Sequence, residues 1–461
     1  MLWAAAVVTA RAAEPAPSEW IDSDTGHRVV RLSSEAGMAS LYFHQNAYTP
    51  DGKKVIVSTA NRGIATIDLA TREVATLVAS GASVIVAGRK SGDVYFTRRL
   101  EGGAASTAGG KEAATEVWVY AINPLTKVER KIAKLPRGGV SSINADETLM
   151  LGSYREGDQG GRGTDGNSAA PAADGASAKA PLNGSQGAGA GGANPTFQGS
   201  YRATWPDGRP MTYAEAKDLS LHNQLMAIRQ GPPQVLFTVN IQTGEIKEVL
   251  KEREWLGHLQ FSPTDPQQIM FCHEGTWHEV DRVWLVRTDG SGLTKVHTRT
   301  MNMEIAGHEF FNADGRTVWY DLQTPRGEDF WVGGYAIATG KRTWYHLQRD
   351  EWSVHFNVAA DGSLFCGDGG DEEMVAHAKN GKWIYLFRPE RIPDVAGVKN
   401  PAADTLIDTG RFTSERLVNM SKHNYLLEPN VSFTPDMKWI VFRSNMSGAV
   451  HTYAVEIAKA R

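Results

Sequence analysis

Four of the 13 histidines stand at nearly the same position before an aspartate-containing turn. They are His44, His258, His308 and His355, each six or seven residues before Asp51, Asp265, Asp314 or Asp361. Glu428 and Asn430 occupy the corresponding position before Asp436. Burying several imidazoles together costs free energy unless they have partners, so the shared position predicts a catalytic or metal site. Imidazole with carboxylate or amide oxygen suits a divalent transition metal such as Mn, Fe, Ni or Zn.

Two further side chains near these histidines favour an anionic sugar as the ligand. Trp277 and Arg282 follow shortly after His273 in the sequence. An indole stacks on the apolar face of a sugar ring, and a guanidinium binds a carboxylate in a two-point fork. The alternative for each residue alone is a solvated position on the rim of the site.

The positions of these residues converge only if the chain repeats one structural unit. A polar stretch, an aspartate turn and an apolar run occur together seven times, at Asp51, Asp93, Asp146, Asp265, Asp314, Asp361 and Asp436. Each copy predicts a hairpin, and a second hairpin follows most copies, as in residues 63–77 and 235–250. Two hairpins make a four-stranded antiparallel blade. The repeats therefore predict an all-β fold, a seven-bladed β-propeller.

The two ends of the chain are expected to meet in the last blade. The final copy lacks its outermost strand, and residues 23–33 offer a strand that would complete it. Such closure removes the open edge of the sheet. In each blade the start of the first strand and the end of the second lie at the same face. The histidines and the strand ends should therefore gather at one mouth of the central channel.

Residues 18–461 are expected to form this single domain, with two segments of other character. Residues 157–192 are rich in Gly, Ala and Ser, which predicts a disordered insertion. Residues 1–13 resemble the remnant of a signal peptide, which predicts a periplasmic or secreted protein. A helix is expected after Thr212, lying over a face of the propeller.

Composition narrows the range of partners. The net charge of −4 gives no reason to expect binding to nucleic acid. No segment holds 18 consecutive apolar residues, so no membrane span is predicted. With two cysteines, Cys272 and Cys366, each after a short apolar run, buried free thiols are favoured over a disulfide. We expect a monomer or weak oligomer that binds an acidic oligosaccharide.

Several short motifs resemble those of the oligogalacturonate lyase family. They are WLGH at residues 255–258, FCHEG at 271–275, HEF followed by DG at 308–315, GDG at 367–369 and SFTPD at 432–436. The resemblance covers most of the chain outside the low-complexity insertion. It implies a seven-bladed propeller that cleaves short oligogalacturonides by β-elimination. It also implies a divalent cation, typically manganese.

The resemblance assigns roles to some residues and leaves others altered. It implies that His258 is the proton-abstracting base, that His308 is a metal ligand and that His355 belongs to the site. Where the family has a Gln and two His as further ligands, this chain has Tyr425, Glu428 and Asn430. Glu and Asn still offer oxygen to a divalent cation. The family's catalytic Arg has no clear counterpart; the nearest candidate is Arg229.

These assignments lead to a mechanistic hypothesis. A cation held by His308, Glu428 and Asn430 binds the uronate carboxylate and stabilises the enolate-like state. His258 removes the proton from C5, and His273, Tyr425 or water protonates the leaving oxygen. The substrate is expected to contact His44, Arg282, His355 and Trp277.

Three other functions remain open at this stage. A glycosidase needs two carboxylates flanking the bond, for which Glu274 and Asp321 are the candidates. A non-catalytic periplasmic propeller that binds or scaffolds proteins would not need the histidines. A lyase acting on another uronate glycan would keep the chemistry but change the substrate.

Overall fold

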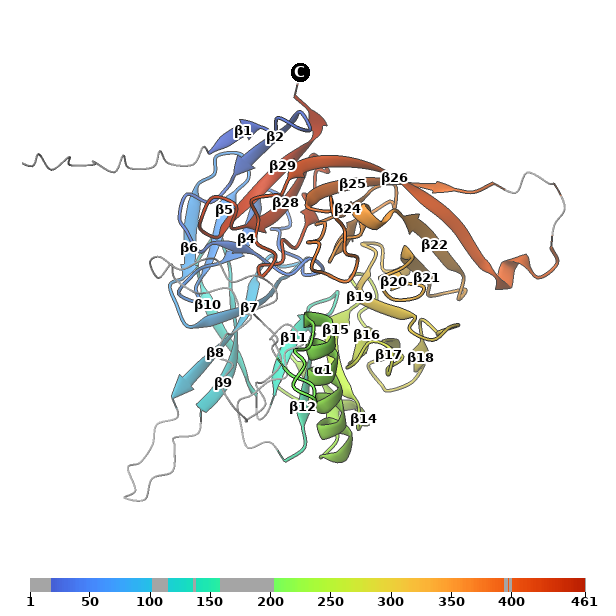
Figure 1. Cartoon of the computed structure of the whole chain (residues 1–461). Helices are drawn as coiled ribbons and strands as arrows, with labels where there is room; N and C mark the ends of the chain where they lie inside the picture. The colour runs from blue at the N-terminus through green and yellow to red at the C-terminus, as the bar shows by residue number, and fades with distance from the viewer. Residues whose placement is uncertain are drawn as a thin grey trace, which may run out of the picture.

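The computed structural model describes residues 18–101, 115–135, 138–157, 203–393, 397 and 400–460. Most of its elements are β-strands that pair antiparallel with their neighbours in the sequence (Figure 1). Consecutive hairpins produce this pattern of pairing. The predicted signal-peptide remnant and, apart from Gly157, the predicted insertion at 157–192 lie outside the described residues.

The described strands form six sheets, four of which hold four consecutive strands each. The first is β3 (Ala39–Ser40), β4 (Lys54–Ser58), β5 (Ile64–Asp68) and β6 (Val74–Val78). The second is β7 (Ala82–Ala87), β8 (Val94–Glu101), β9 (Thr115–Ile122) and β10 (Glu129–Leu135). The third is β11 (Gly139–Ile143), β12 (Leu149–Arg155), β13 (Gln234–Asn240) and β14 (Ile246–Glu252). The fourth is β15 (Trp255–Phe261), β16 (Gln268–Glu274), β17 (Val283–Arg287) and β18 (Thr294–Lys295).

The eight-stranded sheet consists of two four-stranded antiparallel groups joined at their outer edges. One group is β19 (Ile305–Phe311), β20 (Thr317–Gln323), β21 (Phe330–Ala336) and β22 (Arg342–Leu347). The other is β23 (Phe356–Val358), β24 (Phe365–Gly367), β25 (Trp383–Arg391) and β26 (Ile407–Asn419). The long strand β26 extends beyond its own group and pairs in parallel with β22, so that Trp344 lies opposite Thr409. The repeat pattern did not predict this junction.

The five-stranded sheet joins the beginning and the end of the described chain. It contains β27 (Ser432–Phe433), β28 (Trp439–Ser444), β29 (His451–Lys459), β2 (His27–Arg31) and β1 (Glu19–Ile21). β2 pairs antiparallel with β29, with Val29 opposite Val455 and Val30 opposite Ala454. This pairing confirms the predicted closure by an N-terminal strand. The count of seven blades stays a prediction.

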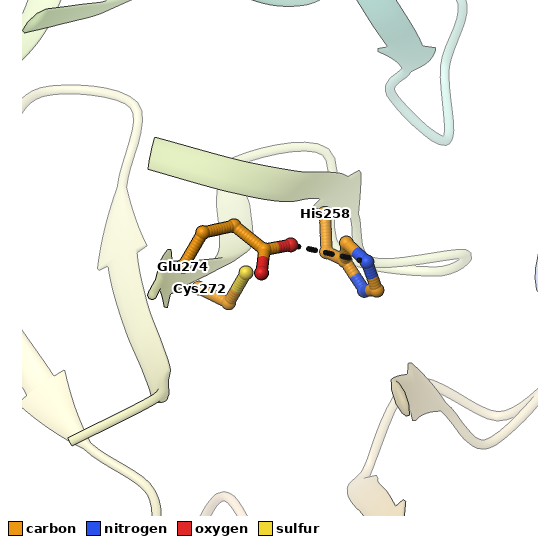
Figure 2. Close-up of side chains that lie close together, drawn as sticks. All are labelled: His258, Cys272 and Glu274. Carbon is orange, nitrogen blue, oxygen red and sulfur yellow. Dashed lines mark ion pairs between the residues drawn. The ribbon is translucent and has the colours of Figure 1, made fainter. Parts of the chain in front are cut away.

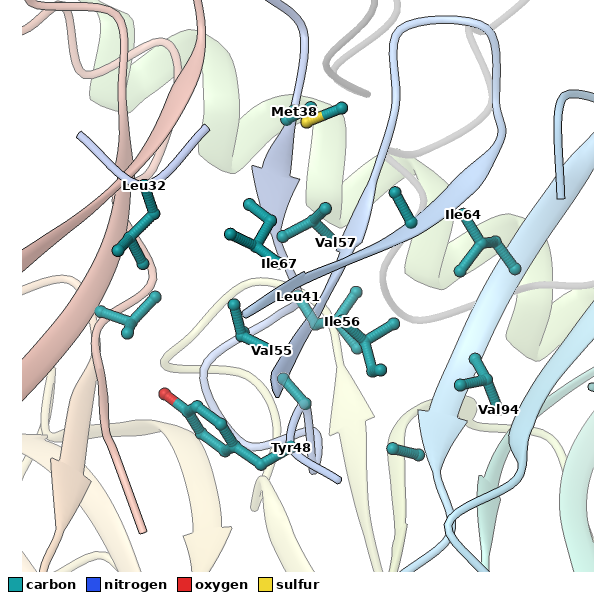
Figure 3. Close-up of a cluster of buried hydrophobic side chains, with 14 of the residues drawn as sticks. Leu32, Met38, Leu41, Tyr48, Val55, Ile56, Val57, Ile64, Ile67 and Val94 are labelled. Atoms are coloured by element: carbon teal, nitrogen blue, oxygen red, sulfur yellow. The ribbon is translucent and has the colours of Figure 1, made fainter. Parts of the chain in front are cut away.

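The first strands of successive sheets lie next to one another around the central axis: β11 contacts both β7 and β15, and β23 contacts β27. This arrangement is a β-propeller. The core lies between neighbouring sheets, which is why middle strands such as β4 and β16 are apolar on both faces. Figure 3 shows one such layer, in which Val55, Val57 and Ile67 pack near Leu32 and Val94.

The helix α1 (Tyr213–Gln230) is the one α-helix among the described residues, and it contacts β15. It begins with a capping box, in which Thr212 and Glu215 satisfy each other's backbone amides. Two short 3₁₀ helices are η2 (Arg349–Glu351) and η3 (Ala403–Thr405). Both cysteines are buried and free, as predicted. None of the described helices is long and apolar enough to cross a membrane.

Candidate active site

Three of the predicted site residues have backbone conformations in the left-handed region, and two of these lie where a strand shifts its register. β15 shifts register against β16 between Gly257 and Gln260, and β19 shifts against β20 between Gly307 and Phe310. His258 and His308 stand within these shifts with φ of 46° and 47°. Asn430, just before β27, has φ of 55°. The left-handed region costs a non-glycine residue free energy, and such strain concentrates at functional sites.

His258 is held by two carboxylates, that of the fully buried Glu309 and that of the partly buried Glu274. Its Nε2 lies 3.3 Å from Oε1 of Glu274, and its Nδ1 lies 3.1 Å from Oε1 of Glu309. Arg282 donates to Glu274 at 2.8 and 3.3 Å and to Glu309 at 3.3 Å. Two carboxylates, one guanidinium and one protonated imidazole balance in charge, which allows these groups to be buried together.

The charges of His258, Arg282 and the two glutamates shift one another's pKa values. Burial alone would lower the pKa of His258, but Glu309 and Glu274 outweigh burial and raise it above its ordinary value. Burial would raise the pKa of Glu309, but Arg282 and His258 hold it well below its ordinary value. The structure therefore favours an ionised Glu309 and a readily protonated His258.

Cys272 completes a cluster with His258 and Glu274. Among the described residues, these three bring potential metal-ligand atoms within 4.8 Å of one another. Figure 2 shows Glu274 pointing at the imidazole, with the thiol beside the carboxylate. However, Arg282 already supplies the positive charge beside Glu274. Burial also raises the pKa of the Cys272 thiol well above its ordinary value, so the thiolate that binds metals is disfavoured.

A second group forms around His355, which is fully buried. Its Nδ1 lies 2.9 Å from Oδ2 of Asp368, whose carboxylate also accepts from the backbone amides of His355 and Asn430 at 2.8 and 3.1 Å. Asp368 thereby fixes the orientation of the ring and leaves Nε2 facing the site. That Nε2 lies 3.7 Å from Oε2 of Glu428. The rings of His308 and His355 meet edge to face, with centroids 5.1 Å apart.

The imidazoles of His308 and His355 each keep one nitrogen without a hydrogen bond. Within the part of the chain that the structure describes, Nδ1 of His308 and Nε2 of His355 have no hydrogen-bond partner. The nearest carboxylate oxygen to Nδ1 of His308 is that of Asp321, at 3.8 Å. Burial lowers the pKa of His308 and so favours its neutral form. Two imidazole nitrogens without hydrogen bonds, beside a carboxylate, are a donor set that divalent transition metals bind.

The side chain of Asn430 is engaged within the fold. Its Oδ1 accepts from the amide of Phe43 at 3.2 Å, and its Nδ2 donates to the carbonyl of Glu428 at 3.0 Å. The structure thus brings His308 and Glu428 to one place with His355, while the amide of Asn430 braces the loop that carries Glu428.

Tyr42 lies among the histidines, although the sequence analysis did not single it out. Its ring contacts those of His44, His258 and His355 at centroid distances of 5.0, 6.0 and 5.1 Å. Burial, and next the charge of Glu428, raise its pKa well above the ordinary value. Burial lowers the pKa of His44 to about 3, so that imidazole stays neutral.

The side chains of two predicted catalytic residues, His273 and Tyr425, bond to other parts of the fold. Side chains alternate along β16, so Cys272 and Glu274 face His258 while His273 faces the other way. Its Nε2 lies 2.5 Å from Glu252, and its ring packs on Trp284. Tyr425 is buried, and its hydroxyl donates to the carbonyl of Asp368 at 2.9 Å.

Trp277 joins the two groups of the site. Its ring lies 4.6 Å from the guanidinium carbon of Arg282 and 5.9 Å from the ring of His308. The indole fits because residue 307 is glycine: a Cβ there would lie 2.6 Å from the Trp277 ring.

Comparisons with known proteins place this chain in a family. The sequence profile described as oligogalacturonate lyase matches residues 223–460. The oligogalacturonide lyase of Pectobacterium atrosepticum is 26% identical over 229 residues, which are 48% of this chain and 55% of that protein. The oligogalacturonate lyase of Dickeya dadantii is 27% identical over 231 residues, with the same two shares. In these matches, the chain spans about half the length of the curated relatives.

Two solved structures show the same fold over nearly the whole chain. An oligogalacturonate lyase in complex with manganese gives a TM-score of 0.64 at 21% identity, covering 96% of each chain. The oligogalacturonate lyase of Vibrio parahaemolyticus gives 0.65 at 21% identity, again covering 96% of each. The profile match extends over more than half of the sequence and includes every predicted site residue except His44. The chain belongs to the oligogalacturonate lyase family.

Proposed function

We propose that this protein cleaves oligogalacturonates by β-elimination with the help of a divalent cation. The observation that carries the proposal is that His258 and His355 both pack against the ring of Tyr42, which brings His258 close to the His308–His355–Glu428 group. Elimination from a uronate needs its carboxylate charge neutralised, a base at C5 and a proton for the oxygen that leaves C4. His258 would be the base, a cation held by the His308–His355–Glu428 group would neutralise the carboxylate, and Tyr42, which lies between them, would supply the proton.

The cation fits His308, His355 and Glu428. Each imidazole has a nitrogen without a hydrogen bond, and the Glu428 carboxylate lies 3.7 Å from Nε2 of His355. Manganese, which a structurally similar oligogalacturonate lyase binds, suits nitrogen and carboxylate donors. When bound, it would supply a Lewis acid that stabilises negative charge on the substrate carboxylate.

His258 accepts the C5 proton in this proposal, and Tyr42 donates one to the departing oxygen. The C4–O bond breaks as the C4=C5 double bond forms, so one proton is taken up and one is released. His258 must be neutral to act as the base, although Glu309 and Glu274 raise its pKa. Tyr42 stays protonated because burial raises its pKa well above the ordinary value. We assign this role to Tyr42 and not to His273 or Tyr425, because His273 bonds to Glu252 and the Tyr425 hydroxyl donates to the carbonyl of Asp368.

The glycosidase alternative finds less support in the geometry. Glu274 is paired with Arg282. One oxygen of Asp321 accepts from Nε1 of Trp352 at 3.1 Å and the other from Gln323 at 3.3 Å. Both candidate carboxylates are therefore committed to neighbours inside the fold.

The test is to incubate the protein and manganese with a panel of uronate oligosaccharides. We expect unsaturated ends from galacturonate oligomers, read as ultraviolet absorbance of the new double bond. His258→Ala and Tyr42→Phe should each lower kcat at least about a hundredfold, with unchanged circular dichroism. Saturated ends would indicate a glycosidase. No cleavage of any substrate would favour a binding protein.

The periplasmic or secreted location expected from residues 1–13 is part of this proposal. An exported lyase would meet pectin fragments before they enter the cytoplasm. Cell fractionation with N-terminal sequencing of the mature protein tests the location: an intact Met1 in the cytoplasmic fraction would contradict it.

A further inference from the structure

The helix α1 is fixed across the face of the propeller that carries the site (Figure 1, green). Leu225 is fully buried and packs over Gly275, immediately after β16. Polar contacts at three levels of the helix add to this packing: Asp218 pairs with Arg326, His222 with Glu279 at 2.9 Å and Arg229 with Glu254 at 2.9 Å. Because these contacts are spread along the helix, they hold it in one position relative to the site.

One turn near the start of α1 presents Lys217 to the mouth of the site. Its Nζ lies 5.9 Å from the ring of Trp277, which also contacts His308. The ammonium interacts electrostatically with the carboxylates of Glu428 and Glu274. Burial lowers the pKa of Lys217, and Glu428 opposes that change. Lys217 thus brings positive charge beside an indole at the edge of the group proposed to hold the cation.

The arginines around the same mouth already serve the fold. Arg282 forms ion pairs with both Glu274 and Glu309. Arg326 pairs with Asp218. Arg443 donates its Nε to the carbonyl of Glu428 at 2.8 Å. Binding a substrate through Arg282, as expected from the sequence, would take the guanidinium away from the fully buried carboxylate of Glu309 and the partly buried one of Glu274, which is costly.

We propose that Lys217 and Trp277 form a subsite for a uronate unit, in which Trp277 stacks on the sugar ring and Lys217 binds its carboxylate. The inference rests on the proposed function. Lysine suits this position because its ammonium is a point charge on a long flexible stem, which reaches a carboxylate without a fixed fork geometry. The subsite would make the protein selective for free uronates over their methyl esters, because esterification removes the charge that Lys217 binds.

Binding measured in a His258→Ala background tests the subsite without turnover. We expect trigalacturonate, titrated by calorimetry in the presence of manganese, to bind about tenfold more weakly when Lys217→Met is added, an effect typical of a charge-assisted contact. Lys217→Arg should restore most of the affinity. Fully methyl-esterified trigalacturonate should not distinguish the variants. Lys247→Met, on the exposed side of β14, is the matched control and should bind as its parent does.

Kinetics in the otherwise unchanged enzyme separate this inference from the function on which it rests. Lys217→Met should raise KM about tenfold and change kcat less than about threefold. Equal trigalacturonate affinity with and without Lys217, or equal loss with Lys247→Met, would overturn the subsite even if cleavage is found. If the unaltered protein binds galacturonate through Lys217 but never forms unsaturated ends, the lyase proposal fails and the subsite stands.

Discussion

His258 shows how a single side chain depends on partners that a sequence motif does not reveal. Its place before the Asp265 turn is readable from the repeat, and so is that of His308. The two carboxylates that face it are less readable. Glu309 adjoins His308 in sequence, but reaches His258 of the neighbouring sheet. Glu274 was visible as a strand end, and only the alternation along β16 separates it from His273.

The charge of Glu309 leads to a prediction about pH. The neutral base form of His258 exists above its pKa, and Glu309 raises that pKa. Glu309→Gln removes the negative charge, so the acidic limb of the kcat/KM profile should move to lower pH by about one unit. Glu415→Gln, which alters a carboxylate 3.3 Å from His27 far from the site, should leave the limb in place. An unmoved limb in Glu309→Gln would mean that His258 is not the titrating base.

At the scale of elements, the sequence predicts the strands better than it predicts the irregularities within them. Alternating apolar residues and turn residues indicate each hairpin. The register shifts in β15 and β19 leave no such pattern, yet they place His258 and His308 in left-handed conformations. The helix α1 was expected over a face, but its amphipathic pattern did not indicate which side chain meets the site. The register shifts and the placement of α1 both depend on packing between distant segments, which the local sequence does not encode.

Gly307 offers a test of how a strand positions a side chain on another element. A Cβ at residue 307 would lie 2.6 Å from the Trp277 ring. Gly307→Ala should therefore displace the indole and lower kcat/KM about tenfold, with a small loss of stability. Combined with Trp277→Ala, it should add little to the effect of Trp277→Ala alone, because both act on the same contact. Additive losses in this cycle would show that Gly307 acts through something other than Trp277.

At the scale of the whole molecule, closure of the ring was the most predictable feature. The last repeat lacked its outermost strand and the N-terminal segment offered one, so the two were expected to pair. In the structure, β2 pairs with β29. The parallel junction between β22 and β26 was not predictable, because it depends on how far β26 runs past its own sheet. The fold class followed from repetition, whereas departures from repetition required the structure.

Ring closure should dominate stability. Val29 in β2 is fully buried, and Val29→Asp introduces a charge between β2 and its neighbours. We expect the free energy of unfolding to fall by roughly 3 kcal/mol or more, measured by urea denaturation. Val128→Asp, at a position that is 59% exposed, is the matched control and should cost less than about 0.5 kcal/mol. Similar values for the two variants would show that the N-terminal strand contributes little to the fold.

The parallel pairing of β22 with β26 has a consequence for the cation site that we propose. His308 belongs to β19 and His355 stands just before β23, so the two imidazoles come from the two groups of strands that this pairing joins. Hydrogen bonds at the outer edge resist hinging of one group against the other. In the proposed cation site, the spacing of the two imidazoles would thereby be set before an ion binds, and an ion of the wrong radius would have to strain the eight-stranded sheet. Selectivity among metals would then be a property of the sheet as much as of its ligands.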